Sequence, residues 1–197
     1  MADTKVYDGV CHCGNVKYRI RLALPPQMDS DPGTKAKVTR IYKCNCTTCL
    51  KLNMFHTRPA EPENDFIVTS PSTIEELGIY NAFGGKNNWY FCKNCGVQCF
   101  GIGAEWVQEE LDVNKWAGKE GGAEKFQKVW KTKALDILGP DGNPVHYVSA
   151  NAVTIEGVDL IEWHDKKWVY YVNNRHGEKG SSRESARYGE PHAGGCY

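Results

Sequence analysis

Seven of the nine cysteines in this 197-residue sequence fall into three short groups. The groups are Cys11-x-Cys13-Gly14, Cys44-x-Cys46-x-x-Cys49 and Cys92-x-x-Cys95-Gly96. Cysteines this close together can form disulfides, a redox pair or the thiolate ligands of a metal ion. The N-terminal residues 1–9 are polar and contain no apolar signal segment, so we expect a cytoplasmic, reducing compartment. In that compartment, clustered cysteines are typical of metal ligands or catalytic groups.

The first and third groups each end in a glycine, which permits a tight turn around the sulfurs. Each turn offers two thiolates, and two turns complete a tetrahedron around Zn²⁺. We therefore predict that Cys11, Cys13, Cys92 and Cys95, the four-cysteine group, hold a structural zinc ion with no open position. A thioredoxin-like redox pair at Cys92 and Cys95 is the alternative, but such a pair requires a βαβ setting, and the surrounding sequence is β-rich.

The middle group, Cys44, Cys46 and Cys49, supplies three ligands and is called the three-cysteine group. Three protein ligands and one open position are typical of catalytic zinc sites. A water or a substrate thiol can take that position, and a zinc-bound thiol ionises near neutral pH. The alternative is a second closed site, completed by Cys99 or His56. With one ion in each group, we predict two zinc ions per chain.

The sequence does not single out a general acid or base for this site. Tyr42, Lys51 and His56 are the polar residues nearest in sequence to the three-cysteine group. Which of them lies beside the sulfurs depends on the fold.

Short runs of apolar and β-branched residues recur along the chain, separated by turn residues. In residues 16–22, apolar residues alternate with charged ones, which predicts a strand with one buried face. We expect further strands at 38–43, 66–70, 89–91, 97–102, 145–149, 152–163 and 167–172. Many short strands favour an all-β fold, mainly antiparallel, with one or two short helices.

One segment has the period of a helix. In residues 121–138, apolar residues recur at spacings of three and four with lysines opposite, which predicts a surface helix packed on the sheet. We expect residues 1–172 to form a single domain with one core. Residues 173–197 are polar and glycine-rich, without periodicity, which predicts a flexible tail.

The charges of the chain balance. The 24 Lys and Arg residues equal the 24 Asp and Glu residues, so the formal net charge is zero. This balance gives no electrostatic reason to expect a nucleic-acid partner. No apolar run approaches the ~20 residues that a membrane-spanning helix needs, so we expect no membrane partner.

The three motifs CHCG (11–14), CNCTTC (44–49) and FCKNCG (91–96) resemble, in order and separation, those of the glutathione-dependent formaldehyde-activating enzyme (Gfa) family, also called the centromere protein V/Gfa domain family. The resemblance extends from about residue 9 to residue 103, with a weaker match over 149–163. It implies an all-β, tent-like assembly of antiparallel sheets that carries zinc. It also implies that the four-cysteine group holds a structural zinc and the three-cysteine group the catalytic zinc.

On this basis we expect a zinc-dependent carbon–sulfur lyase or synthase, which adds a thiol, glutathione in the family, to a small aldehyde such as formaldehyde, or performs the reverse reaction. The partners would be a small-molecule thiol and an electrophile, and a homo-oligomer is compatible with the sequence. The alternative is a non-enzymatic zinc module that binds protein or chromatin. That alternative requires a fourth protein ligand in the three-cysteine group.

Overall fold

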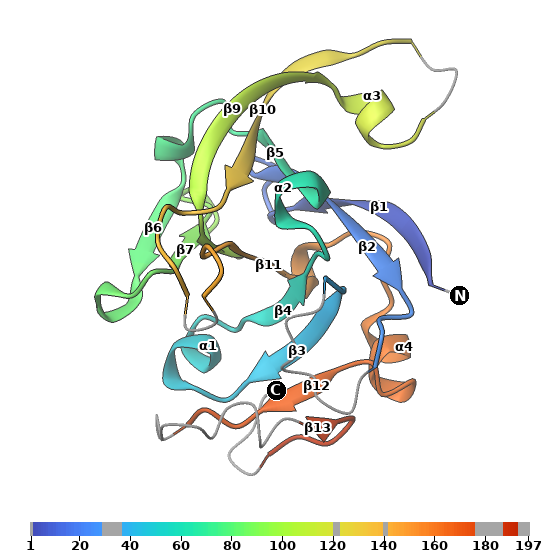
Figure 1. Ribbon diagram of the computed structural model, residues 1–197, viewed down its shortest axis with the longest axis vertical. Coiled ribbons are helices and arrows are strands. Elements are labelled where there is room, and N and C mark those ends of the chain that lie inside the picture. Colours follow the sequence, from blue (N-terminus) through green and yellow to red (C-terminus); the bar gives the residue numbers. More distant parts are fainter. Residues whose placement is uncertain (1, 29–36, 120–122, 140–141, 176–186, 193–197) are drawn as a thin grey trace.

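Two β-sheets form the framework of the protein in a computed structural model, which describes residues 2–28, 37–119, 123–139, 142–175 and 187–192 (Figure 1). The five-stranded sheet has the order β1-β2-β5-β10-β9, and the eight-stranded sheet has the order β13-β12-β3-β4-β11-β8-β7-β6. The strands are β1 (Asp3–Val10), β2 (Lys17–Leu24), β3 (Arg40–Cys44), β4 (Phe55–Arg58), β5 (Phe66–Ser70), β6 (Gly78–Asn81), β7 (Asn88–Phe91), β8 (Gln98–Gly103), β9 (Glu105–Asp112), β10 (Phe126–Lys133), β11 (Tyr147–Asn151), β12 (Tyr170–Val172) and β13 (Arg187–Tyr188), and the α-helices are α1 (Thr47–Lys51), α2 (Pro62–Asp65), α3 (Val113–Trp116) and α4 (Leu160–Asp165).

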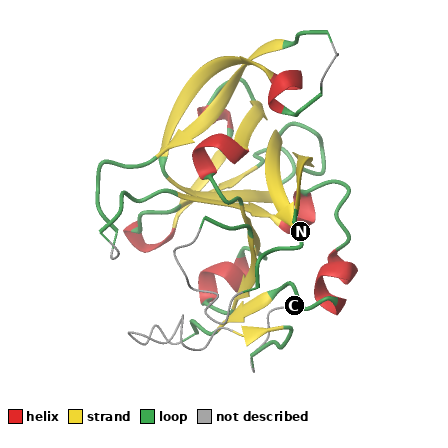
Figure 2. Ribbon diagram, turned by 45° about the vertical axis from the view of Figure 1, so that its right-hand side comes forward, coloured by secondary structure: helices red, strands yellow, loops and turns green. Residues whose placement is uncertain are grey.

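The all-β architecture with short helices is confirmed. The described strand pairs are antiparallel except that of β12 with β3, which is parallel. Figure 2 shows the helices as short segments, and β9 and β10 as a long hairpin with α3 near its far end. No helix in the described ranges has the length and apolar character needed to cross a bilayer.

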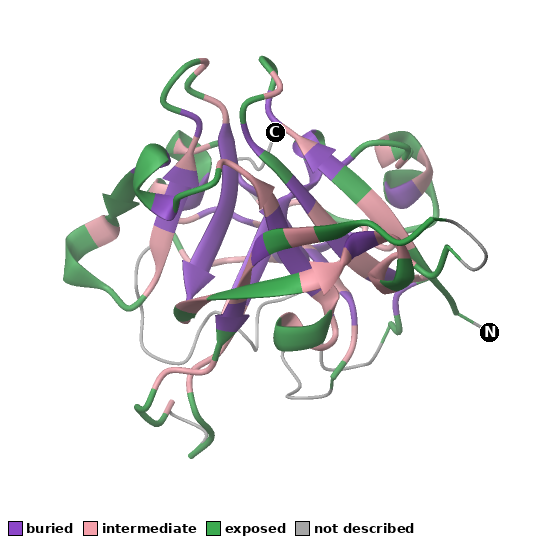
Figure 3. Cartoon of the chain, turned by 90° about the horizontal axis from the view of Figure 1, so that it is seen from above, coloured by how far each residue is buried: buried purple, intermediate pink, exposed green. Residues whose placement is uncertain are grey.

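The main core lies between the two sheets. Tyr18, Ile20 and Leu22 of β2 alternate with more exposed residues, as the sequence pattern predicts. They belong to one cluster with Phe100 and Ile102 of β8, which is a strand of the other sheet. Figure 3 shows buried strand segments gathered at the centre of the molecule. Burial of one face of each sheet is what holds the two sheets together.

The predicted helix over 121–138 is wrong, because this segment contains strand β10 followed by a loop. β10 pairs along its length with β9, which is rich in acidic residues. Lys128 lies directly opposite Glu110, and Lys131 forms an ion pair with Glu109 at 3.0 Å. The lysines thus complement a neighbouring strand rather than mark the exposed face of a helix. Residues 121 and 122 of this prediction lie outside the described residues.

The predicted strand over 152–163 is also wrong. Residues Ala152–Thr154 form a 3₁₀ turn, and α4 begins after Asp159. The Asp159 carboxylate accepts hydrogen bonds from the backbone N–H groups of Ile161 and Glu162 at 2.9 and 3.1 Å. An Asp three residues before a Glu is a helix-start signal, and here it outweighs the alternating apolar residues.

The other predicted strands correspond, with shifts of a few residues, to β2, β3, β5, β7, β8, β11 and β12. Part of the predicted tail contacts the sheet, since Tyr188 of β13 pairs with Tyr170 of β12. The rest of that tail, residues 176–186 and 193–197, lies outside the described residues, as does Cys196.

Candidate metal centres

The four-cysteine group joins two turns that are far apart in sequence. One turn connects β1 to β2 and the other connects β7 to β8. The four sulfurs lie within 4.8 Å of one another. Cys13 Sγ is 3.6 Å from the sulfurs of both Cys11 and Cys92, and Cys13 and Cys92 are 79 residues apart. The structure thus brings together the four predicted ligands, including Cys95.

The two turns have similar construction. The N–H of Gly14 donates to Cys11 O at 3.0 Å, and the N–H of Gly96 donates to Cys92 O at 2.8 Å. Gly14 and Gly96 have φ angles of 81° and 74°, in the left-handed region where other residues are strained. The Val16 N–H donates to Cys11 Sγ at 3.2 Å. The glycines therefore permit the turns that point the cysteine sulfurs toward one another.

These four donors fit a zinc ion. A tetrahedral site with Zn–S bonds of about 2.3 Å has sulfurs roughly 3.8 Å apart, close to the observed 3.6 Å. Hydrogen bonds from the Asn94 side chain and the Asn15 backbone lower the pKa of Cys13 to about 6. Burial raises the pKa of Cys92. A bound cation would favour the thiolate form of both residues.

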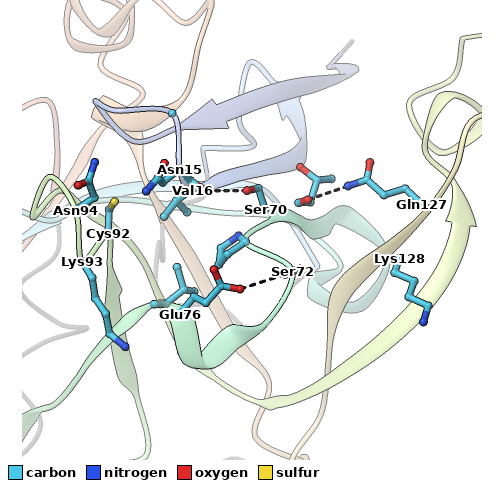
Figure 4. A pocket seen from close by; sticks show the side chains of 14 residues that line it. Asn15, Val16, Ser70, Ser72, Glu76, Cys92, Lys93, Asn94, Gln127 and Lys128 are labelled. Atoms are coloured by element: carbon cyan, nitrogen blue, oxygen red, sulfur yellow. Dashed lines mark hydrogen bonds between the residues drawn. The ribbon is translucent and has the colours of Figure 1, made fainter.

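A pocket of about 890 Å³ lies beside the four-cysteine group. Figure 4 shows Cys92 and Asn94 on one side of this pocket and Gln127 and Lys128 on the other. Its one carboxylate, Glu76, already accepts hydrogen bonds from Ser72 and Thr73. The pocket borders the four-cysteine group, which has no open metal position, so it has no part in the chemistry proposed below.

The three-cysteine group lies where β3 ends and α1 begins. Cys44 is the last residue of β3, and its sulfur accepts the N–H of Cys46 at 3.4 Å. Cys46 caps α1, and its sulfur accepts the N–H of Cys49 at 3.4 Å. The three sulfurs lie within 4.8 Å of one another, with Cys44 and Cys49 buried and Cys46 half-buried. The predicted ligands are therefore brought together here as well.

Three thiols this close cannot all ionise easily on their own. Hydrogen bonds from the thiols of Cys44 and Cys49 lower the pKa of Cys46. The contact with Cys46 raises the pKa of Cys44, and contacts with Cys44 and Cys46 raise the pKa of Cys49. A divalent cation would offset the repulsion among three thiolates, so this donor set also fits zinc.

The two candidates for a fourth ligand, Cys99 and His56, lie in different parts of the structure. Cys99 is buried in the main core, where its thiol donates to Val97 O at 3.3 Å. His56 lies beside the three-cysteine group, with Nε2 3.2 Å from Cys49 Sγ. Among the described residues at this site, however, only the three sulfurs all lie within 4.8 Å of one another. Among the described residues, no fourth metal-ligating side chain completes this group.

His56 is held in place on its other side by two hydroxyl groups. Its Nδ1 lies 2.9 Å from Ser149 Oγ and 3.2 Å from the Tyr147 hydroxyl. The Tyr147 hydroxyl is in turn 2.9 Å from the Tyr42 hydroxyl. Burial lowers the pKa of His56 to about 3, so its ring is neutral near pH 7.

Aromatic rings from neighbouring strands form a row that leads to the three-cysteine group. Tyr170 stacks on Tyr42 with ring centroids 5.1 Å apart, and Tyr42 stacks on His56 at 4.3 Å. His56 meets Trp89 edge to face at 5.8 Å. Two of the three polar candidates from the sequence, Tyr42 and His56, therefore lie at this site, whereas Lys51 is exposed on α1.

Asn45, between Cys44 and Cys46, anchors the loop to the C-terminal segment. Its side chain is fully buried and donates to Asn173 Oδ1 at 2.7 Å. Its own Oδ1 accepts the N–H of Asn174 at 2.6 Å. The cysteine loop is thus fixed by residues far away in the chain, since Asn45 and Asn174 are 129 positions apart.

Sequence reasoning missed Tyr147 and Ser149, which orient His56. They are 91 and 93 residues away from it, so no local spacing connects them. The one sequence signal is that positions 147 and 149 share a face of the strand predicted at 145–149.

Comparisons with known proteins do not show a family for this chain. No protein-family model and no curated protein matches the chain. A solved protein from Rhodobacter sphaeroides, a structural-genomics target, is similar over 79% of this chain and 93% of its own, with 17% sequence identity and a TM-score of 0.40. Similarity at this level carries no conclusion about function.

Proposed function

We propose that this protein is a zinc-dependent carbon–sulfur lyase or synthase that joins a thiol, such as glutathione, to a small aldehyde, such as formaldehyde, and catalyses the reverse reaction. One observation supports this proposal above the others. The four-cysteine group offers a complete tetrahedral set, whereas the three-cysteine group offers three donors and, among the described residues, no fourth. The first arrangement suits a structural ion and the second a reaction centre.

The reaction forms one carbon–sulfur bond. The thiol loses its proton, its sulfur attacks the carbonyl carbon, and the carbonyl π electrons move to the oxygen, which takes up a proton. When bound, zinc supplies the positive charge that favours the thiolate form of a sulfur at the open position. The cysteine sulfurs would hold that charge at the end of β3.

His56 acts in this proposal as a positioning residue for Cys49. With its proton on Nε2, neutral His56 donates to the Cys49 thiolate. Nδ1 then accepts a hydrogen bond from Ser149 or Tyr147, and the Tyr147 hydroxyl can accept one from Tyr42. This arrangement gives each group a partner and directs the donors toward a buried sulfur, which stabilises its negative charge.

Exchange NMR tests this activity. With ¹³C-formaldehyde and glutathione at equilibrium, zinc-loaded protein should speed the exchange between free formaldehyde and S-hydroxymethylglutathione in proportion to its concentration. Cys46→Ser should abolish the acceleration. This variant keeps a hydroxyl that can cap α1, so the fold is preserved while one thiolate is removed.

The matched control is Cys196→Ser, which replaces a cysteine outside both groups and should exchange at the wild-type rate. If the zinc-loaded wild type exchanges no faster than buffer, the lyase proposal is wrong. A non-enzymatic zinc module would then explain the two cysteine groups better.

A further inference from the structure

The sheet face that carries His56 also carries Arg58, which forms no ion pair with any described residue. We propose that Arg58 forms an anion subsite, which binds the carboxylate of a thiol substrate whose sulfur occupies the open position of the three-cysteine group. The protein would therefore select anionic thiols over neutral ones of the same size. This inference rests on the proposed function, because it assumes that a thiol binds at that position.

The register of β4 places Arg58 on the face of the cysteine site. Residues two apart in a strand lie on the same face, about 7 Å apart along the chain direction. His56 and Arg58 have this relation, and His56 contacts Cys49 at 3.2 Å. Tyr147 connects the two, with its hydroxyl 3.2 Å from His56 Nδ1 and its ring 4.6 Å beneath the Arg58 guanidinium.

No acidic side chain of the described residues forms an ion pair with Arg58. Its direct cross-strand partner in β3 is Arg40, a second cation. Like charges directly opposite each other in a sheet are unfavourable. Among the described residues, Arg58 forms no ion pair, and its Nε is buried without a hydrogen-bond acceptor. Its guanidinium lies over the ring of Tyr147.

The guanidinium also acts on the aromatic row that leads to the cysteines. Burial raises the pKa values of Tyr42, Tyr147 and Tyr170, and the positive charge of Arg58 opposes that shift in all three. Arg58 therefore lies within electrostatic reach of the rings that surround the site. A partly buried cation in this position costs free energy unless an anion pairs with it.

A carboxylate on the thiol substrate would supply a negative charge beside Arg58. The planar guanidinium fork matches a carboxylate, and such charge-assisted bonds are about twice as strong as neutral ones. The strand rise of about 7 Å between His56 and Arg58 corresponds to a spacer of roughly three carbons or more between sulfur and carboxylate. The site would thus bind both the sulfur and the carboxylate of a small acidic thiol.

Cobalt-substituted protein tests the inference with two thiols of equal length, 4-mercaptobutyrate and 4-mercaptobutan-1-ol. The absorption bands of cobalt report binding of each thiol. In the wild type, the carboxylate thiol should bind about tenfold more tightly or better. Arg58→Gln should reduce that ratio to near one, while the affinity for the neutral thiol stays within about twofold. Arg58→Lys should recover part of the preference, because it restores the charge without the fork.

Two controls separate a subsite from a structural role. Lys128→Gln removes the same charge from the other sheet and should leave the ratio unchanged. Without ligand, Arg58→Gln should raise the unfolding midpoint by ~2–4 °C, because it removes an unbalanced charge, whereas loss of a structural arginine would lower it. If the variant does not fold, the wild-type preference should still weaken as salt is added.

The outcomes distinguish this inference from the proposed function. If wild-type protein binds both thiols with equal affinity, the anion subsite is wrong while the open thiol site stands. If neither thiol perturbs the cobalt bands, the proposed function fails and the subsite fails with it. If butyrate, which has no sulfur, matches the affinity of 4-mercaptobutyrate, Arg58 binds free anions and the link to the thiol is wrong.

Discussion

Replacing Cys92 by serine should unfold this protein, whereas the same replacement at Cys46 should leave it folded. Cys92 is 2% exposed and belongs to the main core, and its sulfur lies 3.6 Å from Cys13, which is 79 residues away. A structural zinc contributes roughly 10 kcal/mol or more to the folding of small zinc domains. The whole free energy of unfolding of a domain is about 5–15 kcal/mol. Loss of one of four ligands therefore threatens the entire fold.

Cys46 differs in its surroundings. It is half-buried and lies on the loop that follows β3, outside the main core. A serine there can still accept the N–H of residue 49 and cap α1. The expected loss is one zinc ion and the reaction, with a change in the free energy of unfolding of about 1–2 kcal/mol.

The assay compares purified Cys92→Ser and Cys46→Ser with the wild type by zinc content, thermal unfolding and limited proteolysis. We expect Cys92→Ser to be insoluble or rapidly digested, and Cys46→Ser to resist protease and contain about one zinc fewer. Equal loss of structure in both variants would refute the division of roles between the two groups, and so would two zinc ions retained by folded Cys92→Ser.

Three further predictions concern residues that support the two groups. Asn45→Ala removes the acceptor of the Asn174 N–H and the donor to Asn173; it should cost about 1–3 kcal/mol in urea unfolding and expose the segment after residue 172 to protease. Gly96→Ala should cost about 1 kcal/mol, because the strain comes from φ of 74° and nothing lies within 4 Å of the added Cβ; a loss of several kcal/mol would mean an unseen clash. His56→Phe keeps a ring between Tyr42 and Trp89 but removes the nitrogens that contact Ser149 and Cys49; we expect it to lower stability by about 1–3 kcal/mol and to weaken thiol binding, and an unchanged thiol affinity would argue against a positioning role.

The cysteine groups and most strands follow from local sequence patterns. Spacing and the trailing glycines indicate which sulfurs meet, since a short turn limits where its own residues can point. Alternation over 16–22 and the short apolar runs locate β2 and most strands of the core, because burial of one face has a period of two. These signals act over a few residues, so the sequence carries them directly.

Pairing between strands that are distant in the chain leaves no local pattern in the sequence. The lysines of 121–138 look like a helix face until β9 supplies its acidic residues as cross-strand partners. In the same way, β11 brings Ser149 and Tyr147 to His56, and the register of β3 with β4 sets Arg40 opposite Arg58. Tertiary contacts decided these arrangements, and local propensity could not reveal them.

The central claim is that the three-cysteine group keeps one metal position open for a thiol. The most direct test is a crystal structure of the zinc-loaded protein with glutathione, with the metals located by anomalous scattering at the zinc edge. We predict one zinc held by Cys11, Cys13, Cys92 and Cys95, and a second held by Cys44, Cys46, Cys49 and the glutathione sulfur. A second zinc whose fourth ligand is His56 or another side chain of the protein would contradict the claim.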